Sequence, residues 1–269
     1  MKIPNIYIEN IQTRNLLYYD PDFKDVCFNF CQERDIDCLP SLGDPMVFYR
    51  KTETGFCEDD MTSKQMVDSG AYIFERSLLE RFRENPLLFV FKKCELIESI
   101  HLTGVVHFSD YNRLEVSAYL FGMFSDYERS LRRLLILQGL NNQDMLDHFQ
   151  VIIESKKSDK TREIYTNKIA GYERKRDRNE KLPRFEMFYL RDLIELAGRQ
   201  NILNLGQDVN DLRNMVMHAH EFIKKDDASR DEYIYNFSSF ETFFTRVSRL
   251  LGDYKKVNNK IAFMELAQG

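Results

Sequence analysis

The chain of 269 residues contains no tryptophan, only five cysteines and no long apolar run. Without tryptophan, aromatic burial depends on the 21 Phe and 14 Tyr residues. No segment approaches the roughly 18 consecutive apolar residues of a membrane-spanning helix, and the first ten residues lack the apolar core of a signal peptide. These absences predict a cytoplasmic protein without a membrane partner.

The cysteines are odd in number, lie in the first third of the chain and form no CxxC pair. Cys27 and Cys31 are four residues apart, so on a helix they share one face and are interpreted as a buried pair rather than metal ligands. This usage favours reduced thiols and no metal site.

Familiar catalytic motifs are also missing, since the chain has no GxxxxGK[ST], GxGxxG, GxSxG or HExxH sequence. Three of the five histidines, His101, His107 and His148, have no partners at metal-ligand spacing. We interpret them as structural or exposed residues.

The charge is uneven along the chain. The net charge is −5, but residues 1–112 hold 12 basic and 19 acidic residues (−7), whereas the remainder holds 26 and 24 (+2). A surface that binds a polyanion is therefore expected in the second part. Lys175 and Arg176, in its most basic segment, are candidate RNA contacts, although a solvated helix surface explains them as well.

The periodicity of apolar residues changes near residue 112 and predicts an α+β protein with two domains. Residues 1–112 alternate short apolar runs with helical stretches, as in an α/β domain with internal duplication. Residues 113–269 have helical periodicity throughout and predict an all-α bundle. The expected strands are 16–19, 46–49, 71–74, 87–91 and 102–108, and residues 50–70 are expected to be a polar loop. The expected helices are 23–31, 77–84, 114–138, 144–155, 185–197, 208–224 and 238–254.

The predicted helix over residues 208–224 has one apolar stripe. At about 100° per residue, six residues fall on a common arc: Leu212, Met215, Val216, Ala219, Phe222 and Ile223. Asn214 and His218 then lie at one border of the polar face. Arg213 lies about 140° from His218 around the axis. One helix therefore makes a poor site, whereas two copies crossing about a two-fold axis would bring the Arg of one near the His of the other.

The sequence Arg213-Asn214-x-x-x-His218 resembles the RNxxxH signature of HEPN domains, and the resemblance covers roughly residues 113–269. It implies a helical domain that acts as a dimeric, metal-independent endoribonuclease. The residue types suit that chemistry, because imidazole can exchange protons near neutral pH and guanidinium matches phosphate charge. His218 would be the general acid/base, Arg213 the phosphate binder and Asn214 the orienting residue. The alternative is that Arg213 and His218 are solvated residues on an exposed helix face.

One position departs from a pattern within this family. In HEPN toxins that are neutralised by nucleotidyl transfer, a tyrosine stands two residues after the histidine, where this chain has His220. Control by tyrosine modification is therefore not expected. His220 is either a secondary RNA contact or a surface histidine.

The first 112 residues resemble a degenerate tandem CBS pair, a module that binds adenine nucleotides between its repeats. The likeness is greatest over residues 104–110, where Gly104 precedes Ser109 and Asp110. The resemblance implies that Asp110 binds ribose, while His107 stands where a hydroxyl residue is usual. Capping of the following helix explains Ser109 and Asp110 equally well.

Two hypotheses for the whole chain follow. The first is an RNA-cleaving toxin or defence effector, regulated by an adenine nucleotide of the AMP or ATP kind in the first domain. The second is a nucleotide-sensing adaptor without catalysis, whose helical domain serves dimerisation or partner binding.

Overall fold

The computed structural model describes residues 5–34, 36–94, 99–155, 158–225 and 235–268 and has a mixed α+β architecture, as expected. The chain divides into two compact units. The first comprises Met1–Leu120 with His218–Thr245, and the second comprises Phe121–Met217 with Arg246–Gly269. This division differs from the predicted single boundary at residues 112/113, because two long helices each contribute residues to both units.

The first unit contains two three-stranded sheets. In one, β1 (Cys38–Pro40), β2 (Val47–Lys51) and β3 (Phe56–Asp60) form an antiparallel meander. In the other, β4 (Met66–Asp68) runs parallel to β5 (Leu87–Cys94), which pairs antiparallel with β6 (Ser99–His107). Because their strand directions differ, the two sheets are not structural duplicates of each other. The CBS resemblance stays a prediction.

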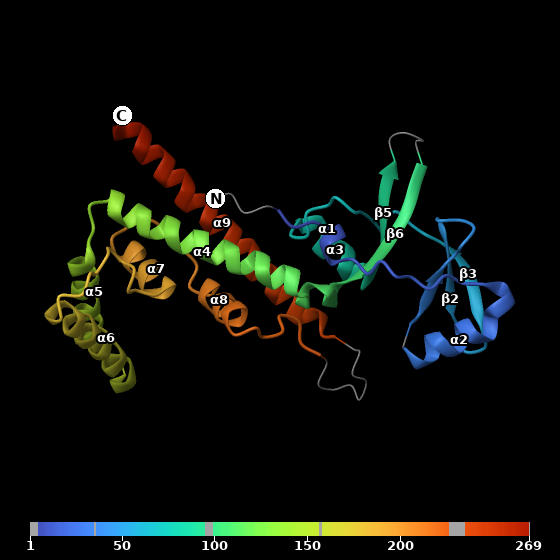
Figure 1. The fold of residues 1–269 in the computed structure, drawn as a ribbon, viewed down its shortest axis with the longest axis horizontal. Coiled ribbons are helices and arrows are strands. Elements are labelled where there is room, and N and C mark those ends of the chain that lie inside the picture. The colour runs from blue at the N-terminus through green and yellow to red at the C-terminus, as the bar shows by residue number, and fades with distance from the viewer. Residues whose placement is uncertain (1–4, 35, 95–98, 156–157, 226–234, 269) are drawn as a thin grey trace. The chain divides into compact units, whose positions relative to one another are not determined.

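Short helices accompany these sheets: α1 (Ile8–Ile11), η1 (Pro21–Phe23), α2 (Lys24–Glu33), α3 (Arg76–Glu84) and η2 (Phe108–Asn112). In Figure 1, α2 lies beside β2 and β3. Cys27 and Cys31 of α2 are buried against Leu39 of β1, which confirms the predicted apolar pair. Helix α3 connects the parallel strands β4 and β5, as such strands require a crossover.

Several strand predictions in this unit were wrong. Residues 16–19 form only an isolated bridge from Tyr19 to Ser41, and residues 71–74 form one from Tyr72 to Tyr7. Conversely, β3 and β4 lie in the segment predicted to be a polar loop. Strand β3 is an edge strand whose last four residues are exposed, so it lacks the apolar alternation by which strands are recognised.

Apolar packing in the first unit occurs in two places. The two sheets share a cluster around Phe48, Met61, Phe89 and Phe91. A second cluster is aromatic and surrounds Phe240, whose ring centroid lies 5.0 Å from that of Tyr111. Phenylalanine and tyrosine therefore fill the core of a unit that has no tryptophan.

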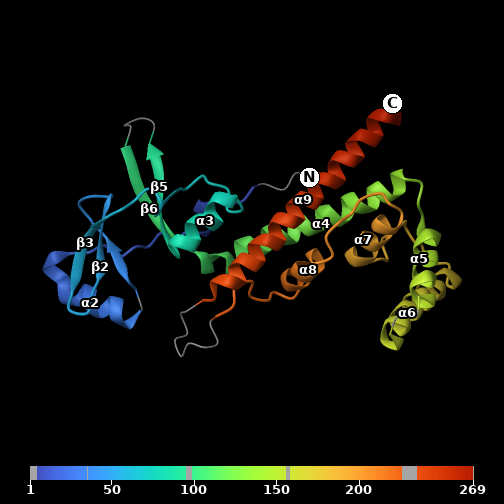
Figure 2. The same cartoon turned by 180° about the vertical axis from the view of Figure 1, so that it is seen from behind.

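The second unit consists of helices over the part of it that the structure describes. Figure 2 shows α5 and α6 side by side. The second unit includes the later residues of α4 (Leu114–Leu137) and of α9 (Phe237–Gln268), together with α5 (Asn142–Glu154), α6 (Asp159–Asp177), α7 (Leu190–Arg199) and α8 (Val209–Met217). Each helix buries apolar side chains, as amphipathic periodicity predicts. The charged segment after α5 is thus largely the helix α6.

Candidate functional site

Helix α8 carries Arg213 and Asn214 and ends at Met217, so His218 lies directly after the helix. The predicted continuation to residue 224 was therefore wrong. Ala219 has a φ of 51°, the left-handed conformation that commonly ends helices. Beyond it, the backbone amides of Phe222 and Ile223 donate to Oδ1 of Asn112 at 2.8 and 2.9 Å. These bonds satisfy amides that a helix would otherwise use.

The early helix end changes the predicted apolar stripe. Leu212 and Val216 are buried on α8, whereas Ala219 is exposed. Phe222 and Ile223 are also buried, but they belong to the non-helical segment. The buried residues of α8 and those of the following non-helical segment are all apolar, which is why the sequence pattern resembled one continuous helix.

Arg213 is held by a carboxylate that the sequence analysis missed. Its Nε donates to Oε1 of Glu128 on α4 at 2.8 Å, and Oε2 of the same carboxylate accepts from Nη2 of Arg132 at 3.2 Å. The Glu128 side chain is only 14% exposed. One partly buried carboxylate therefore orients two guanidinium groups from different helices. Its spacing from Arg132, four residues on a helix, was the available sequence signal.

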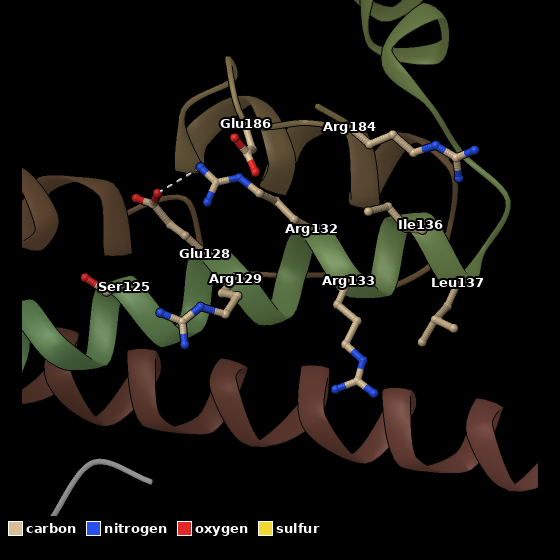
Figure 3. Close-up of a pocket in the computed structure, with 9 residues that line it drawn as sticks. All are labelled: Ser125, Glu128, Arg129, Arg132, Arg133, Ile136, Leu137, Arg184 and Glu186. Carbon is tan, nitrogen blue, oxygen red and sulfur yellow. Dashed lines mark hydrogen bonds and ion pairs between the residues drawn. The ribbon is translucent and has the colours of Figure 1, made fainter. Parts of the chain in front are cut away.

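Glu128 and Arg132 line a pocket of about 700 Å³ in the second unit. In Figure 3, Arg132 extends toward Glu186, while Arg133 points to α9, where it forms an ion pair with Glu265. The walls contain four arginines and two glutamates, and Arg129 and Arg133 are paired with Asp126 and Glu265, so the surplus of positive charge is small. We call this the arginine pocket, and it is lined by Ser125, Glu128, Arg129, Arg132, Arg133, Ile136, Leu137, Arg184 and Glu186.

The remaining candidates for RNA contact are exposed. Asn214, His218 and His220 all face solvent, and the rings of the two histidines are 5.8 Å apart between centroids. Arg213 and Asn214 belong to the second unit, whereas both histidines belong to the first. The motif residues are thus adjacent in sequence but are divided between the units.

Lys175 and Arg176 lie near the end of α6 and are exposed. Arg176 forms a long ion pair with the neighbouring Asp177 at 3.7 Å. Neither residue lines the arginine pocket. They are part of a solvated, basic helix end, as the alternative of a solvated helix surface predicts. RNA binding by these two residues stays a prediction.

The residues predicted to bind nucleotide form a local cap. Asp110 accepts from the backbone amide of His107 at 2.8 Å and from Nε of Arg113 at 2.8 Å. Nδ1 of His107 lies 2.7 Å from Oγ of Ser109. Burial lowers the pKa of His107 to about 4 and raises the pKa of Asp110. Capping accounts for the contacts among His107, Ser109 and Asp110, and the contact with Arg113 is an ion pair. Nucleotide binding stays a prediction.

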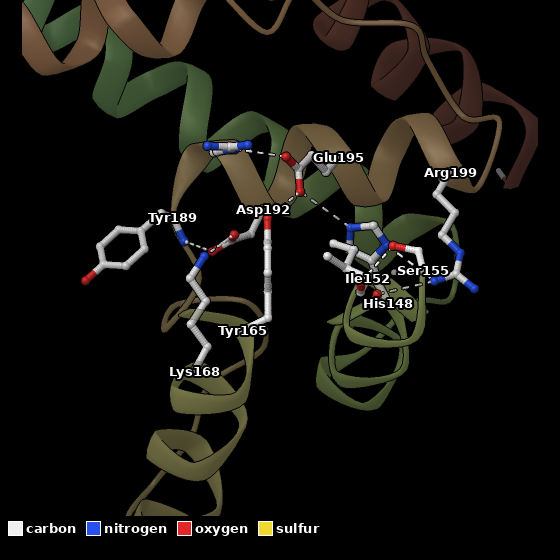
Figure 4. Close-up of polar contacts among 10 residues, drawn as sticks. His148, Ile152, Ser155, Tyr165, Lys168, Tyr189, Asp192, Glu195 and Arg199 are labelled. Atoms are coloured by element: carbon white, nitrogen blue, oxygen red, sulfur yellow. Dashed lines mark hydrogen bonds and ion pairs between the residues drawn. The ribbon is translucent and has the colours of Figure 1, made fainter. Parts of the chain in front are cut away.

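The second unit also contains a polar network on α5, α6 and α7 (Figure 4). Tyr165 donates to Glu195 at 2.9 Å, and Nε2 of the buried His148 lies 3.8 Å from the same carboxylate. Burial alone would raise the pKa of Glu195, but His148, Arg191 and Tyr165 outweigh it and lower the pKa to about 2. Nearby, Lys168 pairs with the fully buried Asp192. This network joins the three helices, and His148 is buried within it.

Comparison of the chain with protein-family models, with curated proteins and with solved structures finds no match. Among the described residues, no group of three or more His, Cys, Asp or Glu side chains is placed to hold a metal ion. No helix in the described ranges has the length and hydropathy needed to cross a membrane. The assignment of function therefore rests on the residues and on the geometry within each unit.

Proposed function

We propose that the chain is a metal-independent endoribonuclease of the HEPN type that acts as a dimer. The observation that carries this proposal is the link from Arg213 through Glu128 to the arginine pocket. A guanidinium held by its Nε keeps its two terminal nitrogens free for the oxygens of a phosphate. The free terminal nitrogens of Arg213 support its proposed role as the phosphate binder.

The proposed reaction needs a proton acceptor, a proton donor and a group that stabilises negative charge. An imidazole such as that of the exposed His218 can remove the proton from the 2′-hydroxyl of the substrate. The 2′-oxygen then attacks the phosphorus, the bond to the 5′-oxygen breaks, and a protonated imidazole returns a proton to that oxygen. Arg213 would stabilise the charge on the phosphate, and Asn214 would orient it. The products are a 2′,3′-cyclic phosphate and a 5′-hydroxyl end.

A second copy of the chain is part of the proposal. The reaction needs one neutral imidazole to accept a proton and one protonated imidazole to donate one, which two histidines can provide. A two-fold axis supplies His218 and Arg213 from each copy. A variant that dissociates into monomers should therefore lack cleavage activity.

The test is a cleavage assay on mixed single-stranded RNA in EDTA, with wild type beside Arg213→Ala and His218→Ala. We expect cleavage by wild type and a loss of at least about 100-fold in each variant, the usual size of a general acid–base contribution. His101→Ala is the matched control, because this exposed histidine lies on β6, outside the motif. Cleavage that persists in the His218→Ala variant and in the Arg213→Ala variant would refute the proposed site.

We further propose that an adenine nucleotide bound by the first unit regulates this cleavage, as in a toxin or defence effector. Arg113 could transmit a change at the proposed nucleotide site to α4, because it directly precedes that helix. Its side chain bonds to Asp110, to the carbonyl of Gln12 and to Thr13. A ligand regulates only if it binds two arrangements with different affinity. Equal cleavage rates with and without AMP or ATP would count against this.

A second candidate is an adaptor without catalysis, and the Glu128–Arg213 ion pair also favours it. A carboxylate that is 14% exposed can hold a neighbouring arginine for structural reasons alone. In that case the helical part serves dimerisation or partner binding. Absence of cleavage under every nucleotide condition, from a protein that still dimerises, would select this function.

A further inference from the structure

The arginine pocket and its immediate surroundings hold guanidinium nitrogens that have no partner among the described residues. Arg132 uses its Nε and Nη2 on the carbonyls of Phe185 and Phe188 and on Glu128. Arg184 also lines the pocket, and its guanidinium has no hydrogen bond or ion pair among the described residues. Arg213 does not line the pocket but is joined to it through its Nε, which donates to the same Glu128. Three guanidiniums from separate segments thus keep terminal nitrogens free.

Charge balance within the pocket favours an anion. The four arginines of the wall face two glutamates of the wall, and Arg129 and Arg133 are also paired with Asp126 and Glu265. When these partners and Arg213 are counted, the group holds five arginines and four carboxylates, a formal charge of +1. Glu128 is already shared between Arg132 and Arg213. Its carboxylate therefore cannot neutralise both guanidiniums, and an anion in the pocket would gain from the residual charge.

The shape of the pocket favours a ligand larger than a single small ion. Its volume is about 700 Å³, and Ile136 and Leu137 add an apolar wall beside the arginines. Ile136 is 36% exposed, which is high for an isoleucine on an amphipathic helix. A chain of sugars and bases linked by phosphates presents both kinds of surface, because its phosphates bind arginine and its base faces bind apolar side chains.

We propose that the arginine pocket binds the phosphodiester backbone of single-stranded RNA, with Arg132 and Arg184 of its wall contacting phosphates and Glu128 orienting Arg132 and the adjoining Arg213. This inference rests on the proposed ribonuclease function and names the surface by which the substrate is held. Glu128 is a positioning residue, since it acts through the two guanidiniums and does not touch the RNA. The shared chemistry is phosphate recognition, which free pyrophosphate could also satisfy.

The experiment measures binding without cleavage. A fluorescent single-stranded RNA of about ten nucleotides, 2′-O-methylated throughout, lacks the attacking hydroxyl and is titrated with the full chain at several salt concentrations. Arg184→Ala is compared with Arg178→Ala. Both remove one exposed arginine, but Arg178 lies at the end of α6, does not line the pocket and forms no described side-chain bond.

We expect Arg184→Ala to weaken binding about five- to tenfold and to reduce the slope of log affinity against log salt by about 0.7, the value for one phosphate contact on a single strand. Arg178→Ala should change the affinity less than about twofold, as nonspecific charge effects do. Equal losses in the two variants would overturn the inference.

A second arm uses inorganic pyrophosphate as a competitor. We expect it to displace the RNA only weakly, because it has no apolar surface for Ile136 and Leu137. Tight pyrophosphate binding that depends on Arg184, with RNA binding that does not, would assign the pocket to a free phosphate compound and refute the RNA inference. Pocket-dependent RNA binding without cleavage of unmodified RNA would instead refute the ribonuclease proposal alone.

Discussion

Replacement of Glu128 by alanine should destabilise the protein more than a typical surface change. The side chains of Glu128, Arg132 and Arg213 are 14%, 23% and 22% exposed. Glu128→Ala leaves two partly buried guanidiniums without their shared counter-ion. Exposed ion pairs contribute about 0.2–1 kcal/mol, whereas breaking a buried pair costs about 3–5 kcal/mol.

These side chains are neither fully exposed nor fully buried, so we expect Glu128→Ala to lower the free energy of unfolding by an intermediate amount, about 2–3 kcal/mol. For a chain of this length that corresponds to a decrease in melting temperature of roughly 4 to 12 °C. Glu128→Gln should cost less, because an amide oxygen still accepts one hydrogen bond.

The assay is urea and thermal unfolding of wild type, Glu128→Ala and the matched variant Glu163→Ala. Glu163 is an exposed glutamate on α6 without a described partner, so its loss should change the free energy of unfolding by less than about 0.5 kcal/mol. A double-mutant cycle with Arg213→Ala then isolates the pair. Equal stability of the Glu128 and Glu163 variants, or strict additivity in the cycle, would refute the idea that Glu128 holds Arg213.

Three further predictions concern the first unit. Burial lowers the pKa of His107 to about 4, below its ordinary 6.5, so the neutral form is favoured on folding. Stability should therefore fall by about 2–3 kcal/mol as the pH drops from 6.5 to 4, and His107→Asn should remove this part of the pH dependence in urea titrations. Asn112→Ala removes the acceptor of the amides of Phe222 and Ile223 and also the donor to the carbonyl of Ile223, and should cost about 2–4 kcal/mol. Asn112→Asp keeps the acceptor but loses this donor, so it should cost somewhat less; full stability of the alanine variant would contradict this role. Ala219→Gly should raise stability by about 0.5–1 kcal/mol, because glycine adopts a positive φ without strain, and a lower melting temperature would exclude that conformation.

The helices were the most predictable part of the fold. Helix α2, helix α3 and the long α4 begin and end within a few residues of the predicted ranges, because each presents a periodic apolar face to a core. Strand β5 was recognised by its buried apolar run from Leu88 to Phe91. Strand β6 was recognised by apolar residues that are buried or partly buried, Leu102, Val105 and Val106. Strand β3 was missed because an exposed edge strand need not alternate.

The candidate site was predicted only in part. The residues of the motif, the exposure of Asn214, His218 and His220, and the apolar positions Leu212 and Val216 follow from the order of residues in the chain. Glu128 is 85 residues from Arg213 in sequence, and no local pattern connects them. The arginine pocket likewise combines α4 with Arg184 and Glu186 from the segment before α7.

The sequence by itself determined the α+β class, most helices and the residue types at the motif, because these depend on local periodicity and side-chain chemistry. Tertiary structure decided where the motif helix stops and which carboxylate its arginine meets. The side chain of Asn112 binds two amides that would otherwise continue a helix, and the fold brings Glu128 within hydrogen-bond distance of Arg213. Both outcomes depend on groups distant in sequence, whose approach is set by the packing of the whole unit.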